Sequence, residues 1–164
     1  MNEQTTLHLL CGKVASGKST LAKSLAAAKG TILLQEDFWL SNLFADELAT
    51  LSDYVRCSER LRNAMEPHIV DLLRSGLSVV LDFQANTVET RNWMRRIFEA
   101  AGCLHQLHVL DVSNDICKAR LRARNASGSH EFQVSDDEFD RISSYFERPT
   151  DEEGFKLKIH TALT

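Results

Sequence analysis

Short apolar runs alternate with longer amphipathic segments along the whole chain. The apolar runs have the length of buried strands and cover residues 7–11, 31–35, 77–82, 104–112 and 156–159. The segments between them carry helical spacing, capping residues or a terminal glycine, over residues 20–28, 43–50, 53–75, 86–101, 113–125 and 135–147. Five strands that alternate with helices predict a parallel α/β sheet with helices on both faces.

The bulk composition favours one domain and argues against several classes of protein. A chain of 164 residues is long enough for a sizeable core, so we expect a single domain over residues 1–164. The net charge of −4 gives no basic footprint for a polynucleotide. The four cysteines lack C-x-x-C spacing, which disfavours zinc and fits reduced thiols. Without a visible signal sequence or membrane-spanning stretch, we expect a cytoplasmic protein with no membrane partner.

The most specific motif follows the first predicted strand. Residues 12–19 read Gly-Lys-Val-Ala-Ser-Gly-Lys-Ser, which is the complete phosphate-binding pattern G-x-x-x-x-G-K-[ST] between a strand and a helix. Gly12 and Gly17 let the backbone approach a phosphate, and the start of the helix adds a positive dipole end. Lys18 is suited to the β- and γ-phosphates of ATP, and the Ser19 hydroxyl to Mg²⁺. The expected nucleotide-binding residues of this loop are Gly12, Lys13, Val14, Ala15, Ser16, Gly17, Lys18, Ser19 and Thr20.

Two carboxylates follow strands whose ends should lie near the loop. Asp82 ends the apolar run 77–82, where a carboxylate would support the metal beside Ser19; the alternative is a cap for the next turn. Asp37 follows the strand 31–35 and is the candidate base for an acceptor hydroxyl. The alternative for Asp37 is an acidic cap at the start of a helix.

Arginines on the helix 113–125 could reach the transferring phosphates. Arg120 and Arg124 are four residues apart and share a face, whereas Arg122 points elsewhere. A flexible polar segment follows, so we expect a mobile lid around residues 120–136 that carries Arg120 and Arg124 to ATP. The alternative is a solvated basic helix face.

The remaining polar residues give weaker signals. The six histidines show no ligand spacing, and we assign no catalytic histidine. Arg91 is expected at the surface, with a reach to substrate or phosphate as the alternative, and Arg95 and Arg96 are interpreted as ordinary exposed charges. Gln84 and Asn86, just after the strand that ends at Asp82, are candidates for bonding acceptor hydroxyls.

With these residues in place, the chain resembles small P-loop kinases, AAA-type ATP-binding proteins of the branch that holds polynucleotide kinases, zeta toxins, chloramphenicol phosphotransferase and gluconate kinase. The resemblance covers nearly the whole chain and rests on residues 12–19, Asp37, 79–83, 120–125 and 146–154. It implies a three-layer α/β/α sandwich with strand order 2-3-1-4-5, ATP plus Mg²⁺ as cofactors, and γ-phosphoryl transfer to a hydroxyl. In this family the acid that matches Asp37 is the base, and the acid that matches Asp82 supports Mg²⁺.

Three functions follow from this resemblance. The first is a kinase for a small hydroxyl-bearing molecule, acting as a monomer by default. The second is a 5′-hydroxyl polynucleotide kinase, which is less favoured because Phe38-Trp39-Leu40 stands where those enzymes often carry an arginine. The third is a non-catalytic ATP-dependent switch or ATPase. The identity of the acceptor is not encoded in any motif of the chain.

Overall fold

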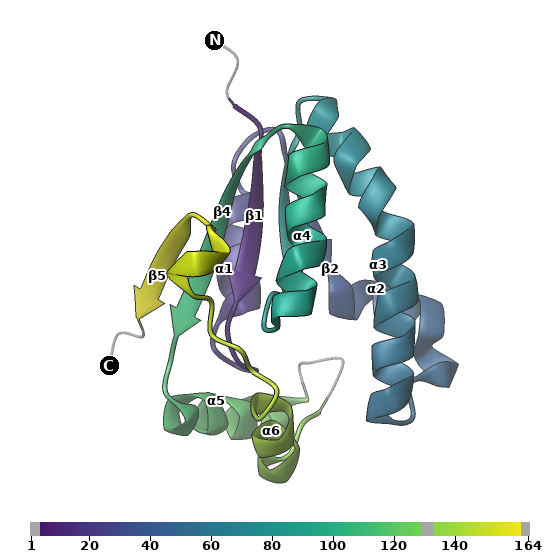
Figure 1. The fold of residues 1–164 in the computed structure, drawn as a ribbon. Coiled ribbons are helices and arrows are strands. Elements are labelled where there is room, and N and C mark those ends of the chain that lie inside the picture. Colours follow the sequence, from purple (N-terminus) through teal and green to yellow (C-terminus); the bar gives the residue numbers. More distant parts are fainter. Residues whose placement is uncertain (1–3, 129–132, 162–164) are drawn as a thin grey trace.

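A computed structural model describes residues 4–128 and 133–161 of the chain (Figure 1). The strands are β1 (Thr6–Cys11), β2 (Thr31–Gln35), β3 (Ser78–Gln84), β4 (Leu104–Asp111) and β5 (Leu157–Thr161). The α-helices are α1 (Lys18–Ala26), α2 (Glu36–Phe44), α3 (Leu51–Arg74), α4 (Val88–Ala101), α5 (Asn114–Ser127) and α6 (Asp136–Ser143).

The strands form one parallel five-stranded sheet in the order β2-β3-β1-β4-β5, which confirms the predicted topology. Alternate residues of the central strands point to opposite faces. Leu7, Leu9 and Leu81 face the larger core beneath α3 and α4, whereas Leu10 and Val80 pack against α1. This alternation fixes the three layers and brings the carboxyl ends of all the strands to one edge, next to α5 and α6 (Figure 1).

The predicted helix over 43–50 is wrong. Helix α2 starts directly after β2 because Glu36 and Asp37 place negative charge in its first turn, and a 3-10 turn over Ala45–Glu47 follows it. The next helix begins at Leu51 rather than at residue 53, because the Thr50 and Asp53 side chains form a capping box.

Two further helix boundaries differ from the predicted ones. The helix expected over 135–147 ends at Ser143, and a turn followed by irregular chain leads to Pro149, before which a helical conformation is disfavoured. Helix α5 continues to Ser127 and ends at a left-handed Gly128. Of the expected lid around 120–136, residues 129–132 lie outside the described residues.

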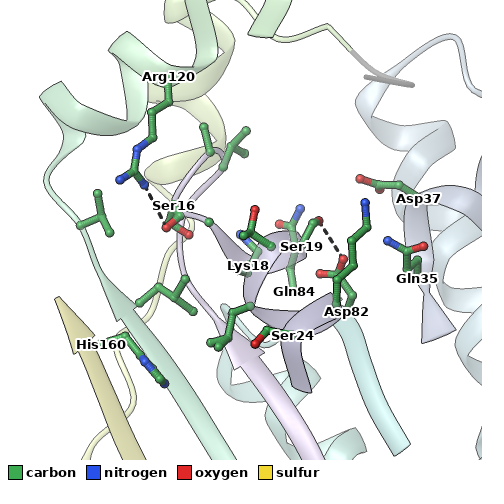
Figure 2. A pocket seen from close by; sticks show the side chains of 18 of the residues that line it. Ser16, Lys18, Ser19, Ser24, Gln35, Asp37, Asp82, Gln84, Arg120 and His160 are labelled. Atoms are coloured by element: carbon green, nitrogen blue, oxygen red, sulfur yellow. Dashed lines mark hydrogen bonds between the residues drawn. The ribbon is translucent and has the colours of Figure 1, made fainter. Parts of the chain in front are cut away.

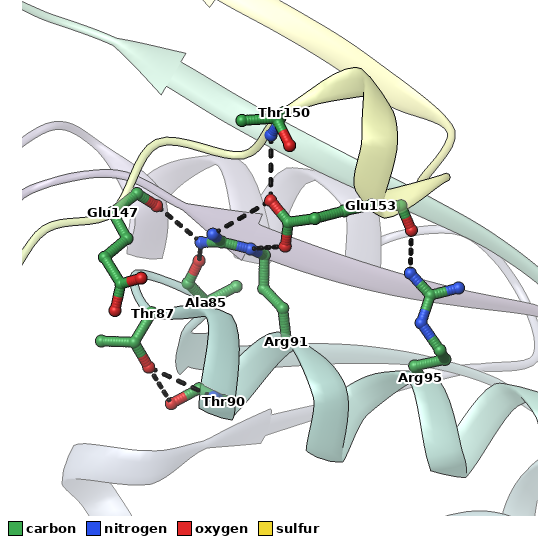
Figure 3. Close-up of polar contacts among 8 residues, drawn as sticks. All are labelled: Ala85, Thr87, Thr90, Arg91, Arg95, Glu147, Thr150 and Glu153. Atoms are coloured by element: carbon green, nitrogen blue, oxygen red, sulfur yellow. Dashed lines mark hydrogen bonds and ion pairs between the residues drawn. The ribbon is translucent and has the colours of Figure 1, made fainter.

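The segment that returns to β5 is attached to α4 by Arg91, whose expected surface position is wrong (Figure 3). Arg91 is completely buried. Its Nε and Nη2 donate to the two carboxylate oxygens of Glu153 at 2.7 and 3.2 Å, and its Nη1 donates to the carbonyls of Ala85 and Glu147. Arg95 adds a hydrogen bond to the Glu153 carbonyl and lies over the ring of Phe155. Arg91 and Arg95 therefore hold residues 147–155 against the sheet.

Three histidines form a hydrogen-bonded row on the α1 side of the sheet. His8 Nδ1 lies 3.2 Å from His108 Nε2, and His108 Nδ1 lies 3.0 Å from His160 Nε2. Burial, followed by the neighbouring His8, His160 and Lys158, lowers the pKa of His108 to about 4. The folded protein therefore favours neutral imidazoles over protonated ones in this row.

This row predicts a loss of stability in mild acid. The unfolded chain binds a proton at each histidine near pH 6.5, while folded His108 does so only near pH 4. Stability from His108 is therefore present above pH 6.5 and is lost between pH 6.5 and 4, by at most about 1.4 kcal/mol per pH unit. Urea unfolding of His108→Gln between pH 8 and 4.5 should show a flatter pH dependence than the wild type.

In the same pH series Glu36 affects stability in the opposite direction to His108, and His68→Gln is the control. Burial raises the pKa of Glu36 to about 7, so Glu36 contributes stability below pH 4.5 that is lost as the pH rises through 7. The difference between the two proteins isolates His108 from this opposite effect. His68→Gln, at an exposed site of α3, should leave the wild-type slope unchanged. If the free energy of unfolding of His108→Gln depended on pH as in the wild type, His108 would not be the cause of the loss of stability in acid.

Among the described residues, no helix has the length and apolar character that crossing a membrane requires.

Candidate active site

The loop between β1 and α1 has the backbone geometry of an anion-binding cradle (Figure 2). Ala15 and Gly17 both adopt positive φ, at 61° and 101°, and helix α1 begins immediately afterwards at Lys18. Such left-handed residues turn successive N–H groups toward one side, where the helix dipole also favours negative charge. The buried Lys18 donates from Nζ to the carbonyls of Gly12 and Lys13 at 2.5 and 2.8 Å. Burial lowers the pKa of Lys18, against the opposing effect of Asp82.

Asn86 fixes the first glycine of the loop, a contact that the sequence analysis did not foresee. Its Oδ1 accepts from the Gly12 N–H at 2.9 Å, and its Nδ2 donates to the Gly12 carbonyl at 2.8 Å. These two bonds leave one lone pair of Oδ1 and one N–H of Nδ2, and Asn86 also lines a neighbouring cavity. Helix α4 begins after Thr87, whose Oγ1 accepts from the Thr90 N–H.

Gly12 has no room for a side chain. A Cβ atom at this position would lie 2.5 Å from Ser16 Oγ and 3.2 Å from Leu110 Cβ. We expect Gly12→Ala to push the loop away from its cradle geometry and to destabilise the fold by about 1–3 kcal/mol. Thermal unfolding should show a lower Tm, and the Kd for ATP should rise.

A second substitution separates the two contacts at Gly12. Gly12→Ala combined with Ser16→Ala removes the closer clash and should restore part of the stability. The remaining approach to Leu110 predicts that the rescue is incomplete. A Gly12→Ala protein with wild-type stability and ATP affinity would contradict this account of the loop.

The structure brings Ser19 and Asp82 together, as the sequence predicted. Ser19 Oγ donates to Asp82 Oδ2 at 2.8 Å. Asp82 lies near the carboxyl end of β3, in register with Gln35 of β2. Hydroxyl and carboxylate oxygens are hard ligands that suit Mg²⁺, so these two residues fit a magnesium ion held partly by phosphates and water. Within the described residues there is no cluster of three or more His, Cys, Asp or Glu that could hold a metal by itself.

The two acids after β2 have different environments. Asp37 is half-buried in the first turn of α2, and its side chain lies at the cleft beside the loop (Figure 2). Glu36 is buried and accepts hydrogen bonds from Tyr54 Oη at 2.9 Å and Ser58 Oγ at 3.0 Å. Burial is the main cause of the raised pKa of Glu36. Both acids line the cleft, but the carboxylate of Glu36 is anchored to α3, whereas Asp37 is half-buried.

The arginines of α5 lie on two different sides of the helix, as predicted. Arg120 and Arg124 both line the cleft, and Arg120 Nη1 donates to the Ser16 carbonyl at 3.3 Å. Burial lowers the pKa of Arg124, while the charge of Asp37 acts in the opposite direction. Arg122 points away and forms an ion pair with Asp136 at the start of α6.

These residues surround one cleft of about 1100 Å³ at the carboxyl edge of the sheet. In Figure 2, Arg120 and Asp37 lie on opposite sides, with Lys18 and Ser19 between them. The predicted site residues that line it are Val14, Ala15, Ser16, Gly17, Lys18, Ser19, Thr20, Asp37, Asp82, Arg120 and Arg124. Lys13 does not line this cleft but a neighbouring cavity, and its Nζ donates to Asn114 Oδ1 at 2.7 Å.

A second cavity of about 620 Å³ adjoins the cleft. Val14, Glu36 and Gln84 line both spaces, and Gln84 is therefore placed where an acceptor could be bound. Glu36 and Arg62 also line this cavity, and neither was predicted from the sequence. The only early signal for Glu36 was its place beside Asp37 at a strand end; Arg62 gave none, because helix α3 carries several similar arginines.

Comparisons with known proteins agree with this geometry. A family model described as an AAA domain matches residues 7–149. No curated protein sequence matches the chain.

The fold is similar to several solved structures. A protein of Chloroflexus aurantiacus J-10-fl, named as a candidate kinase, is 20% identical, with a TM-score of 0.76 over 97% of this chain and 86% of that chain. APS kinase CysC of Mycobacterium tuberculosis, in complex with AMPPNP and APS, is 22% identical, with a TM-score of 0.64 over 96% and 88%. A sugar kinase of Janibacter sp. HTCC2649 is 16% identical, with a TM-score of 0.66 over 96% and 85%.

Proposed function

Because the chain belongs to this AAA domain family and has the fold of P-loop kinases, we propose that it transfers the γ-phosphate of Mg-ATP to a hydroxyl of a small molecule. The observation that carries the proposal is that the cleft at the phosphate loop adjoins a second cavity. A phosphate-binding cleft alone would serve a switch as well as a kinase. A second cavity that shares Glu36 and Gln84 with the cleft provides a place for an acceptor at the phosphate end.

The predicted site residues have the following roles in this proposal. The backbone of residues 12–19 and Lys18 bind the β- and γ-phosphates, and Arg120 and Arg124 stabilise charge on the transferring group. Ser19 and Asp82 would hold Mg²⁺, which would neutralise phosphate charge when bound. Asp37 orients the acceptor hydroxyl and takes its proton. The oxygen of that hydroxyl then bonds to the γ-phosphorus, and the bond to the β,γ-bridging oxygen breaks.

The polynucleotide alternative has less support from the charges around the second cavity. A strand of nucleic acid needs a basic groove that follows its phosphates. The cations that line the second cavity are Lys13 and Arg62, and the exposed carboxylate of Glu89 lies at the same site.

Acceptor-dependent ADP formation tests the proposal. Mg-ATP would be incubated with the protein alone and with pools of 5′-hydroxyl oligonucleotides, nucleosides, sugars, sugar acids and apolar alcohols. A kinase produces ADP faster with one pool than without any pool. A slow rate that no pool changes would favour a switch or an ATPase. Lys18→Ala is the control for a contaminating kinase, and its activity should fall to background.

A further inference from the structure

The walls of the second cavity are largely apolar. Aliphatic and aromatic side chains come from the first turns of α3 on one side and from α6 and the segment after it on the other. They are Leu51, Tyr54, Val55, Ile142, Tyr145 and Phe146. The side chains of Val55 and Tyr145 are 54% and 64% exposed. Exposed apolar side chains that gather at one cavity often mark a binding site. Such walls favour an acceptor with an apolar body over one covered by hydroxyls.

Arg62 is a cation that lines this cavity and makes its hydrogen bonds to neutral groups. Arg62 is half-buried, and its Nη1 donates to Thr90 Oγ1 at 3.2 Å while its Nε donates to the Ser58 carbonyl at 3.4 Å. Both partners are neutral. In the part of the chain that the structure describes, no carboxylate lies within ion-pair distance of Arg62. A guanidinium in such surroundings is a good partner for an acidic ligand group.

The other charged groups of the cavity oppose Arg62 only in part. The charge of Arg62 acts to lower the pKa of Glu36, but the Glu36 carboxylate accepts its hydrogen bonds from Tyr54 and Ser58. Burial raises the pKa of Glu36 to about 7, which favours its neutral form more than in an exposed glutamate. Glu89 is exposed in the first turn of α4. Lys13 lies over Phe146, 5.4 Å from the ring centroid, and adds a second positive charge to the cavity.

We propose that this cavity binds a hydroxyl-bearing acceptor with an apolar body and one carboxylate, and that Arg62 binds the carboxylate. The inference rests on the proposed kinase function, and it names the class of acceptor. The apolar body would contact the walls formed by α3 and Phe146, and the hydroxyl would point through the opening beside Gln84 toward Asp37. Arg62 is then a specificity residue that does not touch the reacting atoms.

A set of four probes separates the two parts of this proposal. 3-Phenyllactate has an apolar body and a carboxylate, and 3-phenyllactamide has the same body without the charge. Gluconate has the charge on a polar body, and glucose has neither feature. Isothermal titration calorimetry with the full chain measures their binding without requiring catalysis. We expect 3-phenyllactate to bind at least about tenfold more tightly than each of the other three.

Matched variants place the binding in this cavity. Arg62→Met keeps an apolar stem and should weaken 3-phenyllactate by about 10- to 100-fold, while it changes 3-phenyllactamide by less than about twofold. Arg60→Met removes an exposed arginine from the same helix and should change neither. Val55→Gln should weaken both phenyl probes, and Leu43→Gln, at an exposed apolar site of α2, should not. Arg62→Lys keeps a charge at this position and should retain part of the preference for the acid.

Several results would overturn the proposal. Gluconate or the amide could bind as tightly as 3-phenyllactate, Arg62→Met could leave its Kd unchanged, or no probe could bind below about 10 mM. The failure of the kinase function would look different. 3-Phenyllactate would then bind through Arg62, while Mg-ATP transferred phosphate to none of the acceptors. If phosphate reached another acceptor and 3-phenyllactate did not bind, the kinase function would stand and the acceptor class would be wrong.

Discussion

Asp37→Ala is expected to lower the rate of phosphoryl transfer by about 10²–10⁴, which is roughly 3–5 kcal/mol of activation free energy. Asp37 lies at the cleft in the first turn of α2, while the neighbouring Glu36 is anchored by Tyr54 and Ser58. Without Asp37, no equivalent carboxylate orients the hydroxyl and takes its proton. ATP binding depends on residues 12–19, so the Kd for ATP should change little. Steady-state transfer kinetics and a separate ATP titration measure the two effects.

Two further variants sharpen this test. Asp37→Asn keeps the size and hydrogen-bonding shape of the side chain but accepts no proton, so it should be nearly as slow as the alanine variant. Asp46→Ala removes an exposed carboxylate from the 3-10 turn after α2 and should leave the rate unchanged. A wild-type rate in Asp37→Ala would contradict its role as the base and leave it as a favourable negative charge in the first turn of α2.

Arg91→Met is expected to have the largest effect on stability. It removes the buried partner of Glu153 and leaves the carbonyls of Ala85 and Glu147 without their donor. Breaking a buried ion pair from one side costs about 3–5 kcal/mol. For a domain of this size that corresponds to about 6–20 °C in Tm. Differential scanning calorimetry and urea unfolding measure the loss.

The matched control is Arg96→Met on the same helix. Arg96 pairs with Glu66 at 3.3 Å but is largely exposed, and such surface pairs contribute about 0–1 kcal/mol. The double variant Arg91→Met/Glu153→Leu removes both charges and should be more stable than Arg91→Met alone, because no unpaired carboxylate remains. Equal stability of Arg91→Met and Arg96→Met would contradict the structural role of Arg91.

The features predicted well from the sequence are those that short segments determine. The phosphate loop is a contiguous motif, and its flanking strand and helix follow from local patterns. The proximity of Ser19 to Asp82 also followed, because parallel strands bring their carboxyl ends to one edge.

The features that were missed depend on partners far away in the sequence. Arg91 looks like any helical arginine until the return of residues 147–153 buries it. His8, His108 and His160 share no spacing, and only the strand order aligns them. The start of α2 was misplaced for a local reason. Asp37 was interpreted first as a catalytic base and only in the alternative as part of a helix start, although Glu36 and Asp37 together favour a helix N-terminus.

The most direct test of the account follows the γ-phosphate itself. Mg-ATP labelled in the γ-position would be incubated with the protein and the acceptor pools, and the products separated from ATP and inorganic phosphate. The account predicts one labelled phosphoester, formed by the wild type and lost in both Lys18→Ala and Asp37→Ala. Label that appears only in inorganic phosphate, at a rate that no acceptor and neither variant changes, would contradict the claim that this cleft is the active site of a kinase.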